Sequence, residues 1–140
     1  VSERHNMNRE SILNYLLKLL STFKYHSNML AEVIDILANS GAERQFFTQL
    51  VTRLRQLSSR GVLATQFDGF EPIEQSIYSM KFKASSYNIR ILYGFLPSAE
   101  PVLLLAFYER WGKRCTSYAP QIAAAVSRLN EIREDSDNGI

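Results

Sequence analysis

The sequence predicts an α+β domain in which N-terminal helices and a C-terminal helix pack on a sheet of three to five strands, antiparallel or mixed. Two patterns support this prediction. Apolar residues recur every three or four positions over residues 10–58 and again over 118–134, which is typical of amphipathic helices. Over residues 78–108 they recur at every second position instead, which is typical of strands. The 140 residues, 46% of them hydrophobic, suffice for one domain with its own core.

The helical part divides into several helices. Residues 10–38 carry two apolar stripes, and Ser21 to Asn28 is the expected break between them. The glycine of Asn39-Ser40-Gly41 suits a left-handed helix end. The clearest helix is expected over residues 42–58, and the last one over residues 118–134.

Three strands joined by short turns are expected over residues 78–83, 89–95 and 102–108. Turn length predicts their register, with Lys81 opposite Arg90 and Arg90 opposite Tyr108. Because the apolar strand neighbours of Arg90 are expected on the other face, Arg90→Ala is expected to keep the fold.

The net charge is only +2, but residues 81–114 hold six basic residues against two acidic ones. The expected register gathers part of this block on one sheet face, namely Lys81, Lys83, Arg90 and Arg110 beside Tyr108. Like charges opposite one another destabilise a strand pair by roughly a few tenths of a kcal/mol to 1 kcal/mol. An anion would relieve that repulsion, and a phosphodiester suits cations beside a tyrosine. The alternative is a row of long cationic side chains that extend into water, and the spacing leaves both open.

Other chemistry is sparse. His5 and His26 have no cysteine or histidine at ligand spacing, so no metal or other cofactor is expected. Cys115 is the single cysteine, which excludes an internal disulfide, suits a reducing compartment such as the cytoplasm and indicates a bystander thiol. The sequence shows no apolar stretch of membrane-spanning length and no signal peptide.

Five segments resemble a known family. They are Ile77-Tyr-Ser-Met-Lys-Phe-Lys83, Asn88-Ile-Arg-Ile-Leu-Tyr93, Val102-Leu-Leu-Leu-Ala-Phe-Tyr-Glu-Arg110, Lys113-Arg-Cys-Thr116 and Ile122-Ala-Ala-Ala-Val-Ser-Arg-Leu129. Together they resemble the RelE/ParE toxin superfamily, and within it the phage-derived, HigB-like branch. The resemblance covers residues 42–133.

The resemblance implies two helices packed on a curved antiparallel sheet, a cognate antitoxin that is a helix-turn-helix protein, and ribosome-dependent cleavage of mRNA. In that reaction a 2′-hydroxyl attacks the adjacent phosphate while basic residues stabilise the developing charge. Lys81 matches the family's strand-end cation, Arg90 its strand arginine and Arg110 its second lysine after the phenylalanine. These three residues and Tyr108 form the expected catalytic set. The expected RNA contacts are Lys83, Lys113 and Arg114.

The chain departs from the family pattern at two positions. Leu105 stands where the family often has a histidine, and Glu109 stands where it has a lysine. A proton-transfer group would then be Tyr108, Tyr118 or a lysine, or it would be absent. Two alternatives stay open: a ParE-like inhibitor of DNA gyrase, and a superfamily member that has lost activity and serves as a binding module.

The sequence pattern and the resemblance together divide the chain. Residues 1–40 are expected to be a helical N-terminal extension without the family's short opening strand, residues 41–134 a toxin domain, and residues 135–140 a disordered tail. Residues 62–74 have the composition of a loop.

Overall fold

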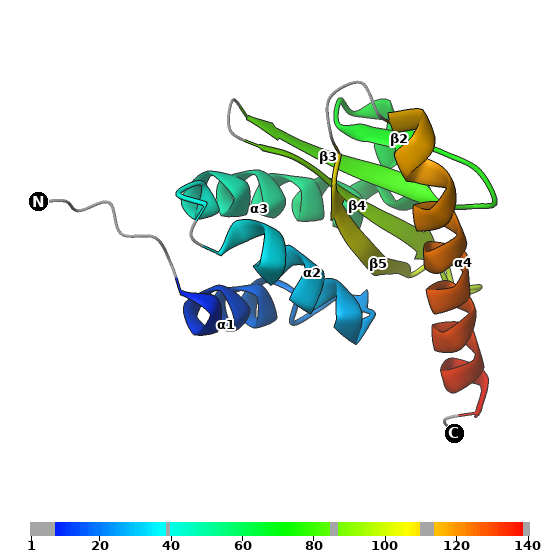
Figure 1. The fold of residues 1–140 in the computed structure, drawn as a ribbon. Helices are drawn as coiled ribbons and strands as arrows, with labels where there is room; N and C mark the ends of the chain where they lie inside the picture. Colours follow the sequence, from blue (N-terminus) through cyan, green and yellow to red (C-terminus); the bar gives the residue numbers. More distant parts are fainter. Residues whose placement is uncertain (1–7, 39, 85–86, 110–113, 139–140) are drawn as a thin grey trace, which may run out of the picture.

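The structure, a computed structural model, describes residues 8–38, 40–84, 87–109 and 114–138. It confirms the expected α+β fold, since helices precede a mixed sheet of five strands and a long helix follows it (Figure 1). The elements are α1 (Arg9–Leu19), β1 (Lys24–Tyr25), α2 (Ser27–Leu37), α3 (Glu43–Arg60), the 3₁₀ helix η1 (Gly61–Gln66), β2 (Phe70–Pro72), β3 (Tyr78–Ala84), β4 (Tyr87–Phe95), β5 (Pro101–Tyr108) and α4 (Arg114–Asn138). Within the described part of the chain, no helix is long and apolar enough to cross a membrane.

The sheet order is β1-β5-β4-β3-β2. β1 runs parallel to β5, and the other neighbouring strands are antiparallel. The expected register of the first hairpin is confirmed, because Lys81 pairs with Arg90 and Met80 with Ile91. Side chains along β3 and β4 alternate between the two faces of the sheet.

Helices α1, α2 and α3 cover one face of the sheet (Figure 1). Their apolar stripes pack with side chains of the strands into one buried cluster, as amphipathic helices on a sheet should. Its largest fully buried members include Ile12, Leu16, Met29, Leu37, Phe46, Phe47, Leu50, Leu57, Phe82 and Tyr93. The helices of residues 9–37 therefore share a core with α3 and the sheet.

The opposite face is covered by α4 (Figure 1). This second cluster contains Ile77, Leu92, Leu96, Val102, Leu104, Leu105, Phe107, Ile122, Ala125 and Leu129. Burial on both faces explains why residues 102–107 are apolar without interruption. α4 is longer than the expected helix over 118–134, so residues 135–138, expected in the tail, are helical; residues 139–140 lie outside the described part.

Two short strands were absent from the sequence prediction. The expectation that residues 1–40 contain no strand is wrong, because Lys24 and Tyr25 pair with Val102 and Leu103 of β5. Likewise, β2 lies within the expected loop over 62–74 and pairs with β3. Strands of two and three residues are too short to show a repeat of two, so the sequence pattern could not reveal them.

The second hairpin corrects the expected register. Arg90 pairs with Phe107, not with Tyr108, and Tyr108 pairs with Ile89. The shift occurs where Leu92 pairs with Leu105 but the next residue of β4 pairs with Leu103, so Leu104 is the extra residue of a β-bulge. After the bulge, each β5 side chain lies on the face opposite to the one that strict alternation from Leu103 would give. Tyr108 therefore lies on the opposite face of the sheet from Arg90.

An ion pair closes the edge of β5 at this bulge. Arg128 of α4 contacts both carboxylate oxygens of Glu32 of α2, at 2.9 and 2.6 Å. Glu32 also accepts a hydrogen bond from the Ala106 backbone N–H at 3.0 Å, and Arg128 donates to the Leu104 carbonyl at 2.8 Å. Because β1 pairs only with Val102 and Leu103, this ion pair occupies strand-edge groups that the sheet leaves open.

A second arginine joins α3 to β3. Arg53 donates two hydrogen bonds to the Lys81 carbonyl, at 3.2 and 3.1 Å, and its guanidinium lies 5.7 Å from the centre of the Phe70 ring. Burial lowers the pKa of Arg53, and the charge of Asp68 opposes that shift. Gly69, at φ +93°, leaves room for the guanidinium, since a Cβ there would lie 2.3 Å from it.

The Glu32–Arg128 pair should carry measurable stability. Arg128→Met and Glu32→Gln are each expected to lower the free energy of unfolding by about 2 kcal/mol, because each leaves strand-edge and charged groups unpaired. The double variant should lose less than the sum of the two. Urea unfolding measures all three, with Asp35→Asn as control: its pair with Arg9 is about two-thirds exposed, and the change should stay within about 0.5 kcal/mol. Additive losses would contradict the coupling.

Tyr93 makes stability depend on alkaline pH. It is fully buried, and its hydroxyl has no hydrogen-bond partner in the described structure. Burial raises the pKa of Tyr93 well above its usual value, and Tyr78, stacked on it at 5.4 Å, adds to the shift. The folded chain thus keeps the proton at pH values where the unfolded chain, with a pKa of about 10, loses it.

The free energy of unfolding is unaffected by Tyr93 ionisation below pH ~10. As the pH rises further, ionisation of Tyr93 in the unfolded chain lowers it by up to about 1.4 kcal/mol per pH unit. Tyr93→Phe should remove this part of the alkaline loss and gain about 1 kcal/mol at neutral pH, since it removes an unpaired buried hydroxyl. Urea unfolding at neutral pH and at pH ~11 tests both effects. An equal alkaline loss in the two proteins would contradict the assignment.

Candidate functional site

Two of the expected basic residues lie side by side on the sheet face that α4 covers. Lys81 of β3 and Arg90 of β4 are directly paired, and both alternate with residues of the first core. The bulge in β5 adds Phe107 to this face beside Arg90. The expected row Lys81–Arg90–Tyr108 is therefore wrong in its third member, because the sequence pattern does not show the extra residue in β5.

Arg90 lies at the centre of a buried polar cluster. Only 5% of the residue is exposed. Its Nη2 forms an ion pair with Glu109 Oε1 at 2.5 Å, its Nη1 donates to Asn88 Oδ1 at 2.6 Å, and its Nε donates to the Tyr118 hydroxyl at 3.1 Å. The Tyr118 hydroxyl lies 3.5 Å from Glu109 Oε1. Every nitrogen of the guanidinium thus has a partner.

Each member of the cluster is placed by a different element. Asn88 precedes Arg90 by two residues in β4 and so lies on the same face. Glu109 follows the last residue of β5, and its backbone N–H donates to the Asn88 carbonyl at 2.8 Å. Tyr118 comes from α4, and its ring meets Phe107 edge-on at 5.5 Å. The bulge that turns Phe107 toward α4 therefore also seats Tyr118 beside Arg90.

Acidic partners neutralise the cations that face one another across β3 and β4. Arg90 is paired with Glu109, and Lys81, 35% exposed at its side chain, forms an ion pair with Glu71 of β2 at 2.6 Å. The like-charge repulsion expected across the strand pair is thus relieved by two carboxylates of the chain. Arg90 is buried and is not part of an exposed row. This burial argues against the expectation that Arg90→Ala leaves the fold undisturbed, because the variant would leave Glu109 buried without its cation.

The other expected site residues do not join this cluster. Lys83 is exposed near the end of β3, and Tyr108 is 46% exposed on the opposite side of the sheet. Arg110 and Lys113 lie outside the described residues. Arg114 begins α4, but its side chain also lies outside the described part.

Sequence reasoning missed how close Glu109 and Tyr118 are to Arg90. Glu109 was visible only as a departure from the family pattern, and Tyr118 only as one of several proton-transfer candidates. The one signal in the sequence was that Glu109 directly follows a strand whose neighbouring strand carries Arg90. That signal needs the pairing of β4 with β5, which the bulge obscures.

A hollow of about 410 Å³ lies beside the cluster. It is lined by Glu71, Pro72, Ile73, Glu74, Tyr118, Ala119 and Ile122. Tyr118 belongs to both the hollow and the cluster, and Glu71 is the partner of Lys81. The hollow is therefore lined by one hydrogen-bond or ion-pair partner of each of the two cations, Tyr118 for Arg90 and Glu71 for Lys81.

The cluster combines a fixed cation, a carboxylate and a phenol within hydrogen-bond distance of one another. A guanidinium can hold a phosphate and stabilise charge on it. A carboxylate can accept a proton and a phenol can donate one. Among the described residues, no group of three His, Cys, Asp or Glu side chains could hold a metal. His26 caps α2 and contacts Glu131 at 2.7 Å, while His5 lies outside the described residues.

No family model matches the chain, and no curated protein matches it either.

The Arg90–Glu109 pair should show the signature of a buried ion pair. Arg90→Met is expected to lower the free energy of unfolding by about 3 kcal/mol or more, because it leaves Glu109, with 5% of its side chain exposed, as an unpaired charge. Adding Glu109→Leu should recover most of that loss, since both charges are then gone. Urea unfolding measures each variant.

Lys83→Met is the control for removal of a cation, since Lys83 is exposed and its loss should cost no more than about 0.5 kcal/mol. If the double variant is less stable than Arg90→Met alone, the pair does not hold the two charges as described.

Proposed function

We propose that this chain is a RelE/ParE-like toxin that cleaves translated mRNA at the Arg90 cluster. The observation that carries the proposal is the contact of the Arg90 guanidinium with both the Glu109 carboxylate and the Tyr118 hydroxyl. The resemblance of residues 42–133 to that superfamily supports the choice of RNA as substrate. The structure shares with the implied fold the packing of helices on a sheet, although its sheet is mixed because β1 runs parallel to β5.

The chemistry follows from the three groups. Glu109 accepts the proton of a ribose 2′-hydroxyl as the oxygen attacks the neighbouring phosphorus. Arg90 stabilises the negative charge that develops on the phosphoryl oxygens. Tyr118 donates its proton to the departing 5′-oxygen. The bond from phosphorus to the 5′-oxygen breaks, and a 2′,3′-cyclic phosphate and a free 5′-hydroxyl result.

In this proposal the substrate RNA reaches the Arg90 cluster through the hollow beside Tyr118. A phosphate that enters there competes with Glu109 for Arg90 and with Glu71 for Lys81. Both cations already have carboxylate partners, so the phosphate of the substrate replaces a carboxylate and leaves no cation unpaired. Release of Glu109 from Arg90 by the phosphate also leaves its carboxylate free to take up a proton.

The burial of Arg90 favours a second candidate, the binding module without activity. A guanidinium with a partner on every nitrogen and only 5% exposure can equally be a structural centre that holds β4, the end of β5 and α4 together. In that case the chain acts through a surface elsewhere, and the resemblance reflects the fold alone.

Induced expression separates these functions. The chain is expected to arrest growth and to generate new mRNA 5′ ends, but only while translation proceeds. Tyr118→Phe should lower cleavage by about 100-fold or more, because one proton-transfer group is lost. It should keep the fold, since the ring stays in place against Phe107. Mapping of mRNA 5′ ends at equal soluble expression measures the effect.

Tyr108→Phe is the matched control, because it removes the same hydroxyl from the opposite side of the sheet and should leave cleavage unchanged. Full cleavage by folded Tyr118→Phe would rule out the proposed site. Growth arrest with intact mRNA and altered DNA supercoiling would identify a gyrase inhibitor. The binding module predicts no growth effect from soluble, folded protein.

A further inference from the structure

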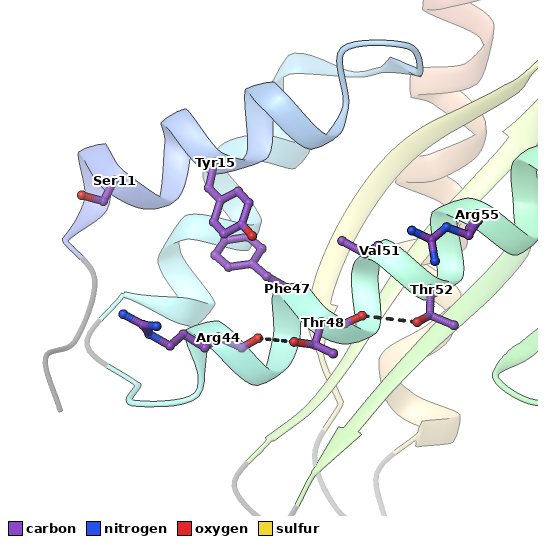
Figure 2. A pocket seen from close by; sticks show the side chains of 8 residues that line it. All are labelled: Ser11, Tyr15, Arg44, Phe47, Thr48, Val51, Thr52 and Arg55. Carbon is purple, nitrogen blue, oxygen red and sulfur yellow. Dashed lines mark hydrogen bonds between the residues drawn. The ribbon is translucent and has the colours of Figure 1, made fainter. Parts of the chain in front are cut away.

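A groove between α1 and α3 lies on the outer side of α3, away from the sheet. Figure 2 shows its eight side chains, with Ser11 and Tyr15 on α1 and the other six on α3. The groove has a volume of about 730 Å³. It continues into a smaller hollow of about 240 Å³, because Val51 and Arg55 line both and Ser58 lines the second. From Arg44 to Ser58 the groove follows α3 for about 20 Å.

The groove is positively charged. Arg44 and Arg55 are exposed, and neither side chain forms an ion pair with a residue that the structure describes. They lie three helical turns apart, about 16 Å along the axis. Among residues 8–38, 40–84, 87–109 and 114–138, no aspartate or glutamate lines either hollow. Within the described part of the chain, both guanidinium groups are therefore available to carboxylates of a partner.

The floor of the groove between the two arginines is largely apolar, although it contains two threonines. The Thr48 hydroxyl donates to the Arg44 carbonyl at 3.1 Å, and the Thr52 hydroxyl donates to the Thr48 carbonyl at 3.4 Å (Figure 2). Both hydroxyl protons are thus used within α3. Tyr15 packs its ring on Phe47 at 4.4 Å and is still 40% exposed. With Val51, these side chains offer an apolar strip.

We propose that this groove binds an acidic amphipathic helix of a partner protein. An apolar face of that helix covers Tyr15 and Val51, and carboxylates about three turns apart meet Arg44 and Arg55. Four turns of helix match the length of the groove, and a helix laid in a groove is a common mode of peptide recognition. The groove lies on the side of the molecule opposite to α4, so this inference does not depend on the proposed function.

The observations favour a helix over a nucleic acid strand. Proteins that hold single strands use a continuous cationic groove with aromatic rings on which bases stack. Here two cations stand at the ends of an uncharged strip, and the threonine hydroxyls are not offered as donors to phosphates.

A synthetic, side-chain-bridged helical peptide of about sixteen residues tests the proposal, with leucines on one face and glutamates on both sides of that face. Its fluorescence anisotropy is measured with the full chain, beside a peptide in which lysines replace the glutamates. The acidic peptide should bind about ten-fold or more tightly than the basic one. The Arg44→Glu/Arg55→Glu variant should reverse this preference.

Arg60→Glu is the matched control, since Arg60 is exposed on the same helix but lines a different hollow, and it should leave the preference unchanged. Thr48→Val should keep or strengthen peptide binding, because the hydroxyl contacts only the helix itself. Equal binding of both peptides, or an equal effect of Arg60→Glu, would overturn the proposal.

A single-stranded RNA oligonucleotide that binds more tightly than the acidic peptide and loses affinity in Thr48→Val would overturn it in favour of nucleic acid. Self-association that disappears in the Arg44→Glu/Arg55→Glu variant would overturn it in favour of a second copy. Cleavage of mRNA by the double variant should equal that of the unaltered chain, so failure of this inference and of the proposed function can be told apart.

Discussion

The β-bulge at Leu104 is the constraint on which the arrangement of the α4 face depends. One extra residue in β5 shifts the pairing with β4, so the side chains after it change faces. Phe107 then points to α4 instead of to the first core, and Tyr108 points away. Because β5 is buried on both faces, an apolar residue is accommodated on either side, and the chain tolerates this shift where a strand with one polar face would not.

The open edge of β5 near the bulge also creates a need that distant residues satisfy. Because β1 pairs only with Val102 and Leu103, N–H and carbonyl groups farther along this edge have no strand partners. Glu32 of α2 and Arg128 of α4 bind those groups and each other. Layers on opposite faces of the sheet are thereby joined around its edge. Charge is used here because an ion pair can bind both kinds of backbone group at once, the carboxylate accepting and the guanidinium donating.

The same electrostatic logic governs the Arg90 cluster. A buried guanidinium is costly unless it is paired and fully hydrogen-bonded, and Glu109, Asn88 and Tyr118 together meet that requirement. The groove of α1 and α3 is the reverse case, since Arg44 and Arg55 are exposed and form no ion pair with a residue that the structure describes. The Arg90 cluster therefore holds its cation paired and buried, while the groove presents two arginines to the solvent.

By itself, the sequence determined the fold class, the long helices and the register of β3 on β4. These follow from local periodicity and a short turn, which act over neighbouring residues. It also determined that Lys81 and Arg90 are cross-strand neighbours. Only the tertiary structure decided which residues surround Arg90 and that Tyr108 is not one of them. Glu109, Tyr118 and the two-residue strand β1 owe their positions to contacts between segments far apart in the chain and to one unpaired residue in β5. Neither leaves a repeat in the sequence, because burial on both faces of the sheet removes the polar–apolar alternation that would have marked the change of face.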